Sequence, residues 1–405
     1  MTEATAQQSL SQPETLTRER LLWILSAATF LIFFQAYMVA PLIPRLATVF
    51  GVSVERIGLI VPAYLIPYGV STLVYGVISD RIGRRSIMLT SLTAFILLTA
   101  ATGFVHSSTQ LLTLRLLTGV GASGVVPLAL ALIGDLFPYR ERGRPLGWLF
   151  GAMAGGMAIG STAGVLSEPF VGWPRLFFGV SALGLILLLA LLPYWDLLGG
   201  ASEHRPAPLR AIIVGYKKLL GTARGLRTYA YVLLNAVFHS GVFTWLGLYF
   251  ARRYRLGEVG IGLALLGYGV PGFLLGPLVG RLADRVGRRW LIPLGLMLAG
   301  ATAAALALDL PVIAAGLLVT LLSLGYDLTQ PLLAGIVTDL GPQRGQAMGL
   351  NVFTLFVGFG LGSLVFSATL ELGFGFALAT FGAVVFFAGL TAVYLFRLEL
   401  PHQRT

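Results

Sequence analysis

The chain carries Gly76-Val-Ile-Ser-Asp80-Arg81-Ile-Gly83-Arg84-Arg85 and, 204 residues later (284 − 80), Gly280-Arg-Leu-Ala-Asp284-Arg285-Val-Gly287-Arg288-Arg289. The same displacement relates residues on both sides of these decapeptides, namely Tyr64 and Tyr268, Pro67 and Pro271, Gly121 and Gly325, Pro127 and Pro331, Asp135 and Asp339, and Pro138 and Pro342. A displacement of about half of the 405 residues predicts an internal duplication, with two similar halves in the same orientation.

The composition excludes a soluble protein. Hydrophobic residues make up 56% of the chain and charged residues only 11%, against about 25% charged residues in an ordinary soluble domain. Stretches of the ~20 mostly apolar residues that a membrane-crossing helix needs lie at 21–44, 57–79, 86–105, 107–137, 146–167, 176–195, 229–251, 261–283, 290–309, 312–340, 349–371 and 374–396. We therefore predict an all-α integral membrane protein with 12 transmembrane helices in two pseudo-symmetric six-helix bundles.

These spans divide the chain into five parts. We expect an N-terminal tail at 1–20, an N-terminal bundle at 21–195, a linker at 196–228, a C-terminal bundle at 229–396 and a C-terminal tail at 397–405. Within the linker, Leu209 to Leu220 could form an amphipathic helix on the membrane surface. A plain polar linker is an equally open alternative.

The basic residues predict the orientation of the chain. Two arginines lie within spans, and only six lie in connectors opposite the tails, so 28 − 8 = 20 of the lysines and arginines share a side with the tails. The six are Arg45, Arg56, Arg175, Arg252, Arg253 and Arg255. This bias places both termini and the linker in the cytoplasm, so the net charge of +11 needs no nucleic-acid partner. Short loops, no N-x-S/T sequon and no leader fit a multi-pass protein of a bacterial inner membrane.

Nothing in the sequence indicates an enzyme, a cofactor or a metal site. Cysteine is absent, the four histidines are scattered, and no P-loop, H-E-x-x-H or G-x-S-x-G pattern occurs. Gly119-Val-Gly-Ala-Ser-Gly124 has the dinucleotide-binding spacing but lies inside an apolar stretch. Close packing of helices through small residues explains it better. Energy for any uphill transport would come from an ion gradient.

Three motifs resemble those of a known family. Both decapeptides match G-x-x-x-D-R-x-G-R-R, which resembles the signature of the major facilitator superfamily. Pro41-Leu-Ile-Pro44 and Arg115-Leu-Leu-Thr118-Gly119-Val-Gly121-Ala122 are similar to motifs of its twelve-span drug/proton antiporter group, with Thr118 replacing a glutamine. The resemblance implies two bundles that move about a central cavity.

The resemblance also implies that the decapeptide turns act as a conformational latch. The residues concerned are Gly76, Asp80, Arg81, Gly83, Arg84, Arg85, Asp135, Asp284, Arg285, Arg288, Arg289 and Asp339. Glycine permits a sharp reversal, and arginines suit the membrane interface next to anionic lipid. The alternative is a set of topology determinants with no conformational role.

Few polar side chains lie well inside the spans, where they are costly against lipid and usually line a cavity. Gln35, Arg115, His239 and Asp327 fall one each on spans 1, 4, 7 and 10, which surround the cavity in the family's fold. We predict a substrate cavity made by Gln35, Tyr37, Asn235, His239, Ser323, Tyr326, Asp327 and Gln330. For each, ordinary helix–helix hydrogen bonding is the alternative, including an i,i+4 bond between Asn235 and His239.

Proton coupling needs a group that changes charge. We predict Asp327, the carboxylate in the middle of a span, as the proton carrier. His239 is second, because imidazole titrates near neutrality. Arg115 would tune the carrier or hold a substrate anion. Under the repeat, Arg115 aligns with position 319, which lies about 12 Å from Asp327 along the helix, so no direct ion pair is expected.

These features predict a secondary transporter that exports small, largely apolar organic compounds by proton antiport and alternating access. The alternative is a sugar or metabolite exporter, a proton symporter or a uniporter of the same superfamily. A membrane enzyme or a non-transporting sensor finds no support in any motif. The expected partners are a small-molecule substrate and the lipid bilayer, and we expect a functional monomer.

Overall fold

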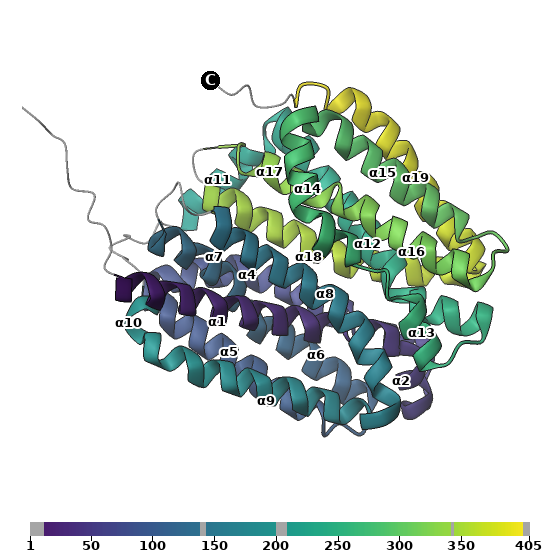
Figure 1. The fold of residues 1–405 in the computed structure, drawn as a ribbon, viewed down its shortest axis with the longest axis horizontal. Helices are drawn as coiled ribbons and strands as arrows, with labels where there is room; N and C mark the ends of the chain where they lie inside the picture. Colours follow the sequence, from purple (N-terminus) through teal and green to yellow (C-terminus); the bar gives the residue numbers. More distant parts are fainter. Residues whose placement is uncertain (1–11, 138–142, 200–208, 342–343, 400–405) are drawn as a thin grey trace, which may run out of the picture.

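The computed structural model describes residues 12–137, 143–199, 209–341 and 344–399, and helices are the regular elements found there (Figure 1). The long helices of the first half are α1 (Gln12–Tyr37), α4 (Pro62–Ile82), α5 (Arg84–Thr102), α6 (Ser108–Ala122), α7 (Val125–Leu136), α8 (Gly143–Val171) and α9 (Trp173–Leu191). Those of the second half are α12 (Ala223–Tyr254), α14 (Val270–Val286), α15 (Arg288–Ala305), α16 (Val312–Asp327), α17 (Gln330–Val337), α18 (Arg344–Thr369) and α19 (Phe374–Leu395). Shorter helices are η1 (Ala40–Leu42), α2 (Ile43–Phe50), α3 (Val54–Gly58), η3 (Leu192–Tyr194), α10 (Trp195–Leu198), α11 (Leu209–Leu220), α13 (Glu258–Ala264) and η4 (Leu370–Leu372).

Ten segments of the described chain are long and apolar enough to cross a membrane, which confirms the predicted all-α membrane class. The spans expected at 261–283 and 290–309 are not among the ten. The first is divided between α13 and α14 and ends in charged residues, and the second begins with Arg288 and Arg289. These charges lower the mean hydropathy of both segments, although α14 and α15 occupy the corresponding places in the fold.

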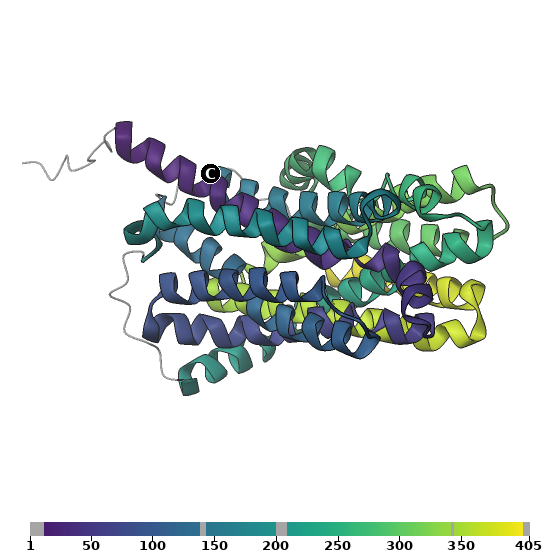
Figure 2. The ribbon, with the colours of Figure 1, turned by 90° about the horizontal axis from the view of Figure 1, so that it is seen from below.

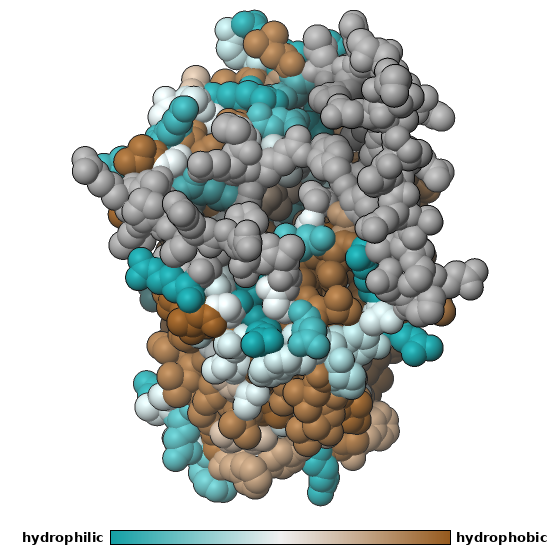
Figure 3. Space-filling view, turned by 90° about the vertical axis from the view of Figure 1, so that its left-hand side faces the viewer, coloured by the Kyte–Doolittle hydropathy of each residue, from teal (hydrophilic) through white to brown (hydrophobic). Residues whose placement is uncertain are grey.

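The helices form two bundles (Figures 1 and 2). Helices α1 to α9 make the lower bundle of Figure 1, and α12 to α19 make the upper one. The start of α1 and the end of α19 lie at the same end of the molecule, which we call the terminal end; the opposite end is the loop end. Viewed onto the terminal end, hydrophilic side chains lie across the middle of the face, and hydrophobic ones continue below them (Figure 3).

The duplication is visible in the backbone. Gly83, between α4 and α5, and Gly287, between α14 and α15, have φ values of 94° and 89°, a region that favours glycine. The turns of the two decapeptides are therefore alike, as the repeat predicts. Each half also has a helix interrupted at the matching place, between α6 and α7 and between α16 and α17, with Pro127 or Pro331 just beyond the break.

The glycine pattern at 119–124 serves helix packing. A Cβ on Gly119 would overlap the carbonyl oxygen of Tyr64 on α4, and a Cβ on Gly121 would lie 3.0 Å from Ala94 on α5. The backbones of α6 and α4 therefore touch directly, which only glycine permits. The close helix packing predicted for this spacing is therefore observed.

The linker contains a helix, α11, so the helical alternative for Leu209–Leu220 is confirmed. Leu219 is buried, and Tyr216 packs beside it against residues of α12 and α18. Ile213 and Val214 are exposed. Helix α12 then begins at Ala223, earlier than the predicted 229, because the Thr222 hydroxyl accepts the Gly225 N–H at 3.0 Å and caps the helix.

An ion cluster joins the end of the chain to the terminal end of the second bundle. The Glu399 carboxylate accepts hydrogen bonds from Arg224 at 2.7 and 2.9 Å and from Arg227 at 2.5 Å. The backbone N–H of Arg289 donates to the Glu399 carbonyl at 3.3 Å. Burial acts to raise the pKa of Glu399, but the two arginines outweigh it and hold that pKa below its usual value.

This cluster predicts a pH dependence of stability. A carboxylate with a lowered pKa stabilises the fold above its unfolded pKa of about 4.3, and this contribution is lost as the pH falls below that value. We expect the unfolding temperature of the purified protein to fall between pH 5 and pH 3 by more than in Glu399→Gln. Parallel losses in the two proteins would show that the cluster does not contribute.

Candidate functional site

The two bundles meet closely at the loop end. Trp245 of α12 packs on Gly58 of α3, where a Cβ would overlap the indole ring. A Cβ on Gly247 of α12 would lie 3.0 Å from the backbone of Pro41. The indole Nε1 donates to the Ser363 carbonyl at 3.1 Å, which fixes the ring. Side chains from both halves thus close this end of the interface.

Charged residues reinforce this closure. Arg45 donates to Glu168 at 3.0 Å within the first bundle and lies 4.0 Å from Glu258 of the second. The side chain of Glu168 is only 4% exposed, and Arg45 is its ion-pair partner.

Removing Arg45 should therefore destabilise the protein. Breaking a buried ion pair from one side costs ~3–5 kcal/mol, and because Arg45 is 44% exposed we expect a smaller loss, about 1–3 kcal/mol, for Arg45→Met. Thermal unfolding of the purified protein measures it. Adding Glu168→Gln should restore part of the loss, because the uncompensated charge disappears; no recovery would contradict the pairing.

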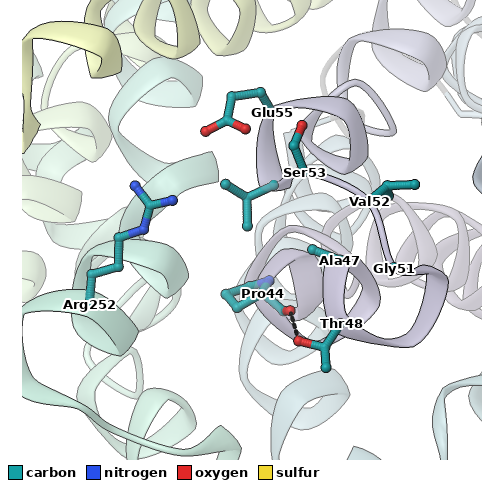
Figure 4. A pocket seen from close by; sticks show the side chains of 9 residues that line it. Pro44, Ala47, Thr48, Gly51, Val52, Ser53, Glu55 and Arg252 are labelled. Carbon is teal, nitrogen blue, oxygen red and sulfur yellow. Dashed lines mark hydrogen bonds between the residues drawn. The ribbon is translucent and has the colours of Figure 1, made fainter.

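A pocket of about 400 Å³ lies at the loop end, between the first bundle and Arg252 (Figure 4). Glu55 and Arg252 extend into it from opposite bundles. Its other lining residues are Pro44, Ala47, Thr48, Gly51, Val52, Ser53 and Val54. None of the predicted cavity residues lines it, so it is separate from the predicted site.

Arg115 lies wholly buried among the helices of the first bundle. Its guanidinium donates to Gln35 Oε1 at 3.0 Å, to the Ala36 carbonyl at 3.3 Å and to the Ile60 carbonyl at 3.2 Å. It also lies 4.3 Å from the centre of the Tyr64 ring. Arg115 thus fixes Gln35, and its partners do not include Asp327, as the helix spacing predicts.

His239 lies in an aromatic cluster at the interface. Its Nε2 is hydrogen-bonded to the Tyr268 hydroxyl, and its ring stacks on Tyr326 with centroids 3.7 Å apart. Phe243 and Phe359 lie 6.3 and 5.9 Å from the imidazole centroid. The same two phenylalanines lie 5.8 and 6.4 Å from Tyr37 of α1, so this cluster contains residues of both bundles.

Asp327 is the last residue of α16. Ser323 donates to its carboxylate at 3.3 Å, and Gly272 of α14 packs against the carboxylate oxygens. Ser323 also accepts the Gly269 N–H at 2.9 Å. A Cβ on Gly269 would overlap Ala158 of α8, in the other bundle. Asp327 therefore lies next to a contact between the bundles and, within the described chain, has no cationic side chain at ion-pair distance.

One local prediction is wrong. Asn235 and His239 do not pair, because the Asn235 amide donates instead to Thr329 at 2.9 Å and to Gln330 at 3.3 Å. Helix α16 ends at Asp327 and α17 begins at Gln330, so Gln330 lies on the helix after the one that carries Ser323 and Asp327. Contacts between distant helices replace the contacts expected along one helix.

Several buried polar atoms near these residues have no hydrogen-bond partner among the residues that the structure describes. They are Gln35 Nε2, the hydroxyls of Tyr37, Tyr64 and Tyr68, Asn235 Oδ1, His239 Nδ1 and Asn351 Oδ1. Buried polar atoms are normally paired. This accumulation marks the region as a place for water or a ligand.

The decapeptide turns place a paired arginine and aspartate in each bundle. Arg84 forms an ion pair with Asp135, and Arg288 lies 3.4 Å from Asp339. Arg85 lies over the Trp195 ring at 4.6 Å, Arg81 is exposed, and Arg289 Nε is buried without a partner. The side chains of Asp80, Asp284 and Arg285, and the surroundings of Gly76, are outside the described part of the structure. The role of these turns as a latch stays a prediction.

Some members of the site escaped the sequence analysis. Phe243 follows His239 by one helical turn, and Phe356 and Phe359 share a face of a glycine-rich helix. Such spacing is also typical of lipid-facing phenylalanine. The signal present was therefore too common to single these residues out.

Comparisons with known proteins agree with this architecture. The model of the Major Facilitator Superfamily matches residues 25–267 and 254–405. The chain is 28% identical to the uncharacterized MFS-type transporter YceJ of Bacillus subtilis (strain 168) over 381 residues, which cover 91% of this chain and 94% of that one. It is 26% identical to a chloramphenicol resistance protein of Pseudomonas aeruginosa over 56% of this chain and 53% of that one.

The solved structure of a D-xylose-proton symporter has the same fold. It superposes with a TM-score of 0.74 at 16% identity, over 93% of this chain and 97% of that one. Family match, relatives and fold agree, and the chain belongs to the major facilitator superfamily of membrane transporters.

Proposed function

We propose that the protein exports small, largely apolar organic compounds in exchange for protons by alternating access. The observation that carries this proposal is the position of Asp327. Its carboxylate has a serine and backbone as neighbours, has no cationic partner among the described residues, and lies beside a contact between the bundles. A carboxylate so placed can take up a proton from one side and release it to the other as the bundles move.

The remaining steps follow from the charges and contacts. The terminal end is cytoplasmic, as the basic residues favour, and the membrane is the inner membrane of a bacterium. The contacts of Trp245, Arg45 and Glu168 at the loop end support a cycle in which this end is closed while the opposite end opens toward the cytoplasm. The decapeptide turns latch the two bundles together in the opposite state, the proton gradient supplies the energy without a cofactor, and one chain suffices.

The apolar substrate class is supported by the aromatic cluster around His239 and by one relative, the chloramphenicol resistance protein. Proteoliposomes with a pH-sensitive dye inside test the proposal. When a proton gradient drives uptake into inside-out vesicles, chloramphenicol as a trial substrate should accumulate and protons should leave. Accumulation that is indifferent to the gradient would contradict proton exchange.

A sugar or metabolite transporter, by export, symport or uniport, is the second candidate. The neutral amides of Gln35, Asn235 and Gln330 favour it, because such groups bind hydroxyls. Growth of an efflux-deficient host on a panel of drugs and carbon sources distinguishes the two. Resistance to drugs supports the exporter, and altered growth on a sugar or an acid supports the alternative.

A further inference from the structure

Arg115 carries a buried positive charge that no negatively charged side chain among the described residues balances. Arg115 is 0% exposed, and its three hydrogen-bond acceptors are the neutral oxygens of Gln35, Ala36 and Ile60. The Tyr64 ring adds only the attraction of its π face. No carboxylate in the described parts of the chain forms an ion pair with Arg115. A buried charge without a counter-charge is costly, so a negative ligand group would be favoured near it.

The Gln35 amide adds hydrogen-bond donors next to this charge. A guanidinium has donors only, so the oxygen of the Gln35 amide must face Arg115. The orientation of the amide is therefore fixed by chemistry, and its two Nε2 hydrogens point elsewhere. Nε2 is buried and has no partner. Gln35 thus offers two unused donors, polarised by the cation behind it.

Three tyrosine hydroxyls complete the polar half of the site. Those of Tyr37, Tyr64 and Tyr68 are buried and unpartnered, and each side chain is at least nine-tenths buried. A hydroxyl can donate one hydrogen bond. Together with Gln35, the first bundle presents a set of free donors to a group that accepts several hydrogen bonds.

Aromatic rings lie beside these donors. Tyr68 stacks on Phe356 of α18 with centroids 4.3 Å apart, and Phe356 lies 5.9 Å from Phe359. Phe359 in turn neighbours Tyr37. A flat ring would find stacking partners here from both bundles.

We infer that the transported compounds are aromatic carboxylates or closely similar aromatic anions. The carboxylate accepts hydrogen bonds from Gln35 Nε2 and the tyrosine hydroxyls, Arg115 balances its charge, and the ring packs against Phe356 and Tyr68. This inference rests on the proposed transport function and narrows its substrate class. Exchange of an outgoing anion for an incoming proton would also be favoured by a membrane potential that is negative inside.

Binding of three small probes to the purified full-length protein tests the inference. Benzoate carries the charge, benzamide is its neutral counterpart, and benzylamine has the opposite charge. Because charge-assisted hydrogen bonds are about twice as strong as neutral ones, we expect benzoate to bind at least about 10-fold more tightly than benzamide, and benzylamine more weakly than either. Calorimetry at neutral pH measures all three.

Gln35→Glu is the decisive variant. It places a carboxylate on Arg115, which neutralises the charge, and it replaces the two donors of Nε2 by an acceptor. The variant keeps a partner for Arg115, so folding should persist, and its unfolding temperature checks this. Benzoate binding should fall to the level of benzamide or below, whereas benzamide binding should change little. Gln110→Glu, on an exposed helix start at the loop end, is the matched control and should leave benzoate binding unchanged.

The outcomes separate the two proposals. Equal binding of benzoate and benzamide, no benzoate binding, or full benzoate binding by Gln35→Glu would each overturn the inference. Benzoate binding with the expected selectivity but transport indifferent to a proton gradient would leave the inference standing and contradict the proposed proton exchange.

Discussion

Asp327→Asn should abolish proton-driven accumulation of substrate. The amide keeps the size of the side chain and can still pair with Ser323, but it cannot take up or release a proton. Without that differential proton binding the gradient has no means to bias the two states. We expect the ratio of substrate inside to outside to fall to about 1 in inside-out vesicles that accumulate substrate with the unchanged protein.

The variant should keep one activity. Exchange of labelled for unlabelled substrate across the membrane needs no gradient, so it should continue in Asp327→Asn. Asp309→Asn is the matched control, since Asp309 is an exposed carboxylate at the loop end that pairs with Arg253. Proton-driven accumulation that survives in Asp327→Asn would show that another group, with His239 as the next candidate, carries the proton.

Gly58→Val should hold the loop end open. A valine at this position would collide with the Trp245 ring, which cannot move aside easily because it is buried and bonded to Ser363. Overpacking of a tight contact costs about 1–3 kcal/mol, which shifts the balance between two states by about 5-fold to 150-fold. Transport should fall by a similar factor.

Labelling with a thiol reagent can follow this shift, because the chain has no cysteine. A single cysteine in place of Ala40, which is buried at the loop end, should react slowly in the parent and faster with Gly58→Val added. Gly179→Val is the matched control, since nothing lies within 4 Å of a Cβ at that position on α9. Unchanged labelling with Gly58→Val would contradict the role of this contact.

The fold could be predicted from the sequence because the internal duplication and the lengths of the apolar stretches can both be read directly from the residues. The decapeptides, the two turn glycines and the paired breaks near Pro127 and Pro331 all follow from the 204-residue displacement. The equivalent pairs of Arg84 with Asp135 and of Arg288 with Asp339 are consistent with the same repeat, although the sequence did not predict these partners.

The arrangement inside the site could be predicted only in part. The position of a residue along a span determines its depth in the membrane. The sequence therefore predicted, before any contact was known, that Arg115 and Asp327 lie at different depths and form no ion pair. The direction in which a side chain points also depends on how distant helices pack. This is why Asn235 bonds Thr329 and not His239, and why Phe359 reaches both His239 and Tyr37.

The direct contact of α6 with α4 at Gly119 has a consequence for the order of events in a cycle. The close approach of the two backbones, the Arg115–Gln35 hydrogen bond and the Arg115–Tyr64 contact tie these residues to one tightly packed unit. If transport runs by the motion we propose, we expect this unit to move as one body. We then expect a molecule bound to it to keep its polar contacts until the aromatic residues of the second bundle separate from it.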